Sequence, residues 1–209
     1  MSTREEFQSR KFPGVLGVLG PLVALAAIFV AILLSQNWFT WDGNALSDLG
    51  NYNNGLPAAI VFNIGLVLTG LLLLVFTYSF VRVVSDLPTK IGMIPFFIAL
   101  VFLIAIGVFS ENAGDIHFTV SVGFFASFPF AIWFVGLGFL RFRKLWWFSL
   151  VSIILPFFSV YMWTSWFGGD FPFWTGNAIP EITTALTGIG WLWIIWLLYD
   201  RSDLSIITK

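Results

Sequence analysis

The chain has 209 residues, of which 58% are hydrophobic, 19% aromatic and only 10% charged. A soluble globule would lack the polar side chains needed to cover its surface, so the composition indicates an integral membrane protein. Cysteine is absent, which excludes disulfides, thiolate metal sites and cysteine nucleophiles, and a single His excludes a haem held by two His residues of one chain. The formal net charge of −1 argues against nucleic acid as a partner, because phosphate binding needs a basic surface.

Six apolar runs are each long enough to cross a hydrocarbon core about 30 Å thick, which takes roughly 20 residues of helix. In chain order they cover residues 13–34, 56–81, 91–109, 118–140, 145–166 and 182–198. The first run follows basic residues, as a signal peptide would, but it is long for one and no small-residue cleavage site follows it. We therefore expect an all-α fold, a six-helix transmembrane bundle that forms one domain over residues 1–209.

The basic residues predict the orientation of this bundle. All ten Lys and Arg residues fall before the first run, after the last, or in the second and fourth connections. Because cytoplasmic loops collect Lys and Arg, we expect a multi-pass protein of the cell membrane with both termini in the cytoplasm. The three outer connections would carry no Lys or Arg, but they would carry His117 and six acids, namely Asp42, Asp48, Glu111, Asp115, Asp170 and Glu181.

Two of the outer connections share a motif. Residues 41–48 and 174–181 both fit W-x-G-N-A-[LI]-x-[DE], and residues 111–115 give a shortened version. Their Asn residues, Asn44, Asn112 and Asn177, are spaced by about one helical hairpin, which is consistent with three repeated hairpins. Two alternatives stay open: the motif residues cap helix entrances and have no chemistry, or the similarity of the loops is coincidental.

The acids and the His predict one outward-facing pocket. We expect Asp48, Glu111, His117 and Glu181 to converge there, with Asn63 in its floor. Carboxylates at close range repel unless they are protonated or bridged by a cation, and a His beside them can carry a proton or bind a metal. The alternative is an interfacial His that water or one carboxylate satisfies. The candidate ligand-binding residues are Asn44, Ser47, Asp48, Asn63, Glu111, Asp115, His117, Asn177 and Glu181, and a metal, if present, would bind Asp48, Glu111, His117 and Glu181.

Segments 44–50, 62–66 and 107–111, the last leading to His117, resemble an uncharacterised family of archaeal and bacterial six-span membrane proteins. That family is a domain of unknown function, similar in layout to membrane proteins of the Frag, DRAM and Sfk type. The resemblance covers nearly the whole chain, implies a prokaryotic source and implies no activity. It differs at Phe109-Ser110, where the family often has Phe-Pro, so the turn before Glu111 is expected to differ. The residues it points to are Ser47, Asp48, Asn63, Glu111 and His117.

Three functions compete on this basis. The first is a binding or structural membrane protein, or a subunit of a membrane complex, whose pocket holds a divalent cation or a lipid headgroup. The second is a membrane-embedded hydrolase or transferase that acts on a lipid-linked substrate through His117 and a carboxylate. The third, a transporter, is disfavoured because broken half-helices and charges near the midplane are missing. No cofactor is evident, no enzyme motif occurs, and the expected partners are membrane lipid and other membrane subunits.

Overall fold

The computed structural model describes residues 3–169 and 175–200. Within them lie six helices long and apolar enough to cross a membrane. These are α1 (Thr3–Leu34), α2 (Leu56–Val83), α3 (Leu87–Val108), α4 (Asp115–Phe139), α5 (Trp146–Gly168) and α6 (Ala178–Asp200). Short 3₁₀ helices, η1 (Ser47–Gly50), η2 (Glu111–Ala113) and η3 (Arg143–Leu145), lie in the connections. The predicted all-α fold with six transmembrane helices is confirmed.

Two helices begin four residues earlier than the apolar runs indicated. The helix α3 begins at Leu87 because the side chain of Asp86 accepts a hydrogen bond from the backbone N–H of Thr89 at 2.9 Å, which caps the first turn. The helix α6 begins at Ala178, with Pro180 in its first turn, where the missing N–H costs no intrahelical hydrogen bond. The cap at Asp86 extends α3, and the position of Pro180 in the first turn allows α6 to start early. Hydropathy alone does not predict either extension.

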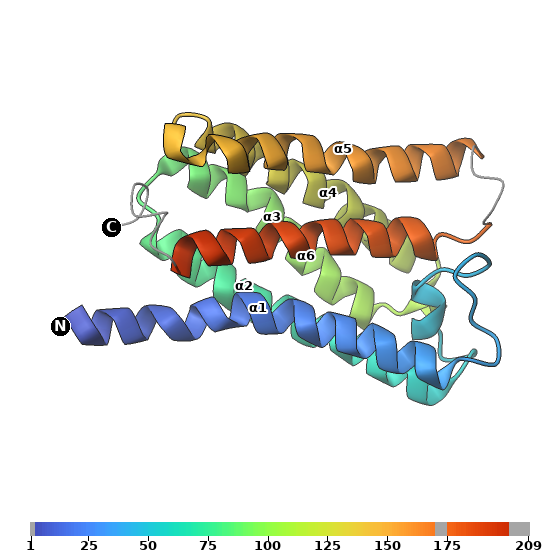
Figure 1. The fold of residues 1–209 in the computed structure, drawn as a ribbon. Coiled ribbons are helices and arrows are strands. Elements are labelled where there is room, and N and C mark those ends of the chain that lie inside the picture. The colour runs from blue at the N-terminus through green and yellow to red at the C-terminus, as the bar shows by residue number, and fades with distance from the viewer. Residues whose placement is uncertain (1–2, 170–174, 201–209) are drawn as a thin grey trace.

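The two ends of the bundle (Figure 1) differ in the charged residues that they carry. The start of α1, the α2–α3 and α4–α5 connections and the end of α6 lie at one end, which we call the basic end. Arg141 there pairs with Asp86 across the two connections, with 2.8 Å between Nη2 and Oδ2. At the other end, which we call the acidic end, lie η1, η2 and the first turn of α6, with Asp48, Glu111 and Glu181. Arg201, Lys209 and Asp170 are outside the described residues.

Helix α6 is fixed in the bundle by one large aromatic residue. Trp191 is fully buried, its ring centroid lies 6.3 Å from that of Phe148 on α5 and 6.0 Å from that of Phe96 on α3, and its indole N–H donates to Ser152 Oγ at 3.0 Å. These contacts join α6 to both α3 and α5. Nearer the acidic end α4, α5 and α6 surround the cavity described below.

Candidate functional site

The two loops that carry the full motif bind each other at the acidic end. The carbonyl oxygen of Asp42 accepts hydrogen bonds from the backbone N–H groups of Thr175 at 2.7 Å and Gly176 at 2.9 Å. The carbonyl oxygen of Asn44 accepts one from the N–H of Ala178 at 2.9 Å. A Cβ atom at Gly176 would overlap the backbone of Asn44, so this close approach requires Gly. The motif copies therefore serve as pairing partners for each other.

The three motif Asn residues make different contacts. The side chain of Asn44 accepts from Thr40 N–H at 2.9 Å and donates to Asp48 Oδ2 at 2.8 Å. The side chain of Asn112, inside η2, joins the first loop through Asn51 Oδ1 and the N–H of Tyr52, both at 2.8 Å. Asn177 directly precedes the α-helix α6, whereas the segment that follows Asn44 forms the 3₁₀ helix η1, which contains Asp48. The local structures thus differ, and a common design of the three hairpins stays a prediction.

Two carboxylates hold the η1 segment over the start of α6. Glu181 is buried, and its Oε2 accepts a hydrogen bond from the backbone N–H of Leu46 at 2.5 Å. Asp48 Oδ2 accepts from the side chain of Asn44 and, at 3.0 Å, from the N–H of Ala45. Both oxygens therefore have backbone partners, and both residues still bring negative charge to this end when they are ionised.

Glu111 and His117 are different, because each has a polar atom without a partner. Oε2 of Glu111 and Nε2 of His117 are buried and find no hydrogen-bond partner within the described part of the chain. The His117 side chain is only 7% exposed, and its Nδ1 lies 2.7 Å from the carbonyl oxygen of Phe109. A carbonyl oxygen only accepts, so Nδ1 carries the proton, and in the neutral ring Nε2 is a free acceptor. Buried polar atoms without a partner are rare and mark candidate ligand contacts.

The carboxyl group of Glu111 also has an unusual acidity. Burial, followed by the hydrogen bond to Asp48 and then by the charge of Asp48, raises the pKa of Glu111 to about 7. Glu111 therefore exchanges a proton close to neutral pH. A positive charge placed beside its carboxyl group would favour release of that proton.

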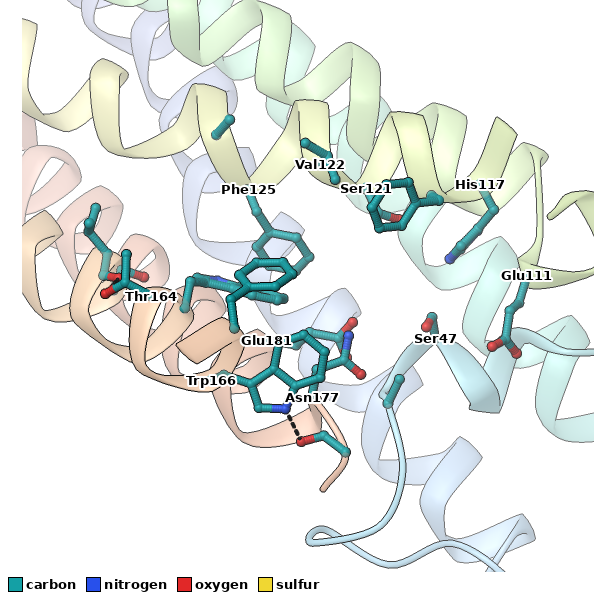
Figure 2. A pocket seen from close by; sticks show the side chains of 18 of the residues that line it. Ser47, Glu111, His117, Ser121, Val122, Phe125, Thr164, Trp166, Asn177 and Glu181 are labelled. Carbon is teal, nitrogen blue, oxygen red and sulfur yellow. Dashed lines mark hydrogen bonds between the residues drawn. The ribbon is translucent and has the colours of Figure 1, made fainter. Parts of the chain in front are cut away.

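These groups form one end of a cavity of about 1010 Å³ between α4, α5, the η1 loop and the start of α6. In Figure 2, His117 of α4 and Glu111 of η2 project toward the side where Ser47 of η1 lies. Most of the rest of the wall is apolar, and much of it is aromatic. It includes Phe118, Phe125, Phe130, Trp133, Trp163 and Phe167. Phe118 and Phe167 are more than 60% exposed, so the cavity opens sideways onto the surface that a membrane would cover.

Six of the nine residues predicted for the site line this cavity: Ser47, Asp48, Glu111, His117, Asn177 and Glu181. Three do not line it. Asp115 is exposed in the first turn of α4, and Asn44 lies behind Asp48 as its hydrogen-bond donor. The prediction that Asn63 forms the floor is wrong. Its side chain is buried and donates to the carbonyl oxygen of Gly50 at 2.9 Å, so it ties α2 to η1.

Metal binding finds no support in this geometry. Among the residues that the structure describes, no three His, Asp or Glu side chains form a group that could hold a metal ion. The set Asp48, Glu111, His117 and Glu181 is thus gathered around one cavity without forming a metal-binding cluster.

The aromatic wall of the cavity was not predicted from the sequence. Phe118, Val122, Phe125, Pro129 and Trp133 recur at helical spacing and line the cavity from α4. That period marks one face of a helix and could have identified it. Periodicity does not predict which helix packs against this face, because that depends on how α4 and α5 are arranged in the bundle.

Fold and site together define a six-span integral membrane protein with an amphipathic cavity at its acidic end. The chain belongs to the family described as "Protein of unknown function (DUF998)", whose model matches residues 18–199. The expectation of an uncharacterised membrane family is confirmed at this level. No curated protein and no solved structure matches the chain.

Proposed function

We propose that the protein binds an amphipathic molecule of the membrane, with the polar head among Glu111, His117 and Asp48 and the apolar chain between α4 and α5. The observation that carries the proposal is the continuity of the cavity. One space of about 1010 Å³ has acids and a His at one end and aromatic walls along the rest. Ligand sites typically combine an apolar lining with a few polar groups that fix orientation.

The dimensions of the cavity suit a lipid chain. Its wall follows α4 from His117 to Trp133, about 24 Å of helix at 1.5 Å per residue. That is most of a hydrocarbon core about 30 Å thick. Because the walls include side chains exposed on the bundle surface, a molecule could enter from the bilayer with its chain remaining in an apolar environment throughout.

The location of the site belongs to the same proposal. Lys and Arg are restricted to the basic end and the terminal segments, so we place the acidic end outside the cell membrane and both termini in the cytoplasm. A role as a subunit of a membrane complex is compatible with this placement. A prokaryotic source and a layout like the Frag, DRAM and Sfk type are expected from the sequence resemblance alone.

A variant that fills the cavity tests the binding function. Ala126 lies on the wall in an exposed position, so Ala126→Trp would put an indole into the cavity without disturbing the core. Ala26→Trp on α1 is the matched control, since Ala26 is also exposed but does not line the cavity. After purification in detergent, native mass spectrometry should find one amphipathic molecule on the wild type and on Ala26→Trp, and none on Ala126→Trp. Equal retention by Ala126→Trp, or none by the wild type, would refute the proposal.

One observation favours a second candidate, a hydrolase or transferase acting on a lipid-linked substrate. His117 lines the cavity, its Nδ1 lies 2.7 Å from the Phe109 carbonyl oxygen, and its Nε2 is left as a buried acceptor without a partner in the described part of the chain, as a general base requires. His117→Gln separates the two functions in the same measurement. An enzyme would leave unprocessed substrate on His117→Gln, with a mass that differs from that of the molecule on the wild type. A binding protein would carry the same molecule in both.

A further inference from the structure

We infer that the head of the bound amphiphile carries a primary amine in its protonated form, in preference to a phosphate, a carboxylate or a quaternary ammonium group. The inference rests on the proposed function, since it names the chemical class of the molecule in the same cavity. It is carried by two independent observations at the acidic end: the sign of the charges and the identity of the unpartnered atoms.

The charges at this end have one sign. The cavity lining includes Asp48, Glu111 and Glu181 and no Lys or Arg. The connections at residues 35–55, 109–114 and 169–177 contain no Lys or Arg either. An anionic head would lie among carboxyl groups with no cation to offset the repulsion. A cationic head would gain from every one of them that is ionised.

The unpartnered atoms select the kind of cation. Oε2 of Glu111 and Nε2 of His117 are both buried acceptors without a donor among the described residues. His117 is more than nine-tenths buried and lines the cavity. A primary ammonium group offers three N–H donors and no acceptor, which complements acceptors that have no donor. A quaternary ammonium group has no N–H, and an ionised phosphate offers acceptors where donors are needed.

The remaining two acids have another role. Asp48 Oδ2 and Glu181 Oε2 already accept hydrogen bonds from the backbone at Ala45 and Leu46. They position the η1 loop and supply charge, whereas Glu111 and His117 are left to contact the head directly. Glu111 is therefore the acid whose removal should change the preference for one head over another.

Four probes with the same hexadecyl chain test the inference: hexadecylamine, hexadecyltrimethylammonium, hexadecanol and hexadecyl phosphate. Each is titrated into delipidated protein in a neutral detergent at pH about 8, where an alkylamine is still protonated. Binding is read by native mass spectrometry, and binding to Ala126→Trp is subtracted as nonspecific. We expect hexadecylamine to bind at least about tenfold more tightly than the other three, the scale of one charge-assisted hydrogen bond.

A matched pair of charge variants identifies the acid responsible. Glu111→Gln keeps the side-chain size and should reduce the preference for the amine over the phosphate by about tenfold. Asp115→Asn removes an exposed acid from the adjacent turn that does not line the cavity and should leave the preference unchanged. The comparison of the four heads on the wild-type protein needs neither variant to fold.

The outcomes separate the two proposals. If no probe binds beyond the level on Ala126→Trp, both the cavity function and the amine head are refuted. If all four bind equally in the cavity, the binding function stands and the amine head is refuted. Tighter binding of the phosphate or of the quaternary ammonium probe would also refute the amine head.

Discussion

Glu111 is the residue at which proton binding and the proposed ligand binding meet. It is faced by Asp48 from η1, by Glu181 from the start of α6 and by His117 from α4, all of which line the same cavity. Burial, the hydrogen bond to Asp48 and the charge of Asp48 hold its pKa at about 7, so a change of pH near neutrality changes its charge. A carboxyl group with an ordinary pKa would already be ionised there.

We predict that the affinity for hexadecylamine rises with pH across this range. A bound cation stabilises the ionised carboxylate and lowers the pKa of Glu111, so binding releases a proton below pH about 7 and affinity increases as pH rises toward about 8. Titrations of the wild type and of Glu111→Gln at pH about 6, 7 and 8 check this. The dependence should be weaker in the variant, and a flat profile in the wild type would contradict the assignment.

At the scale of elements, the contact between the first and last loops positions the site. We predict that Gly176→Ala lowers the free energy of unfolding by about 1–3 kcal/mol, because the added methyl group overlaps the backbone of Asn44. Gly190→Ala is the control. A Cβ atom there meets nothing within 4 Å, and Ala favours a helix more than Gly does. Thermal unfolding in detergent should show a lower midpoint for Gly176→Ala only.

The sequence predicts the helices better than it predicts their contacts. Six spans follow from hydropathy, but helical turns that precede the apolar runs were missed, as at Thr3 in α1, after Asp86 in α3 and before Pro180 in α6. Six predicted positions of the cavity, four acids or amides together with Ser47 and His117, were found because chain polarity puts their loops at one end. Asn63 was misplaced because a buried amide shows nothing in the sequence about its partner, here the Gly50 carbonyl group. The hydrogen bonds between the two motif loops were also missed, because a loop sequence does not show which distant segment its backbone contacts.

For the whole molecule, the orientation in the membrane is the property that decides from which side the head group is reached. The chain has no Cys, so single Cys variants can be labelled without background. We predict that a membrane-impermeant maleimide reaches Asn53→Cys and Ala113→Cys in intact cells, and reaches Arg143→Cys only after the membrane is opened. All three residues are exposed in connections. Labelling of Arg143→Cys in intact cells would reverse the proposed topology.

The hydrogen bond between Leu46 and Glu181 joins residues that are 135 positions apart. Because a chain is synthesised from its N-terminus, the η1 loop exists long before the ribosome reaches α6. Glu181, an acid that would be costly to leave in hydrocarbon, thus enters last and meets an amide donor made much earlier. The polar end of the cavity is completed only by the final helix. A nascent chain halted after five spans would therefore have the walls of the cavity without the carboxylate of Glu181, so the proposed head-group site would be completed only at the end of biogenesis.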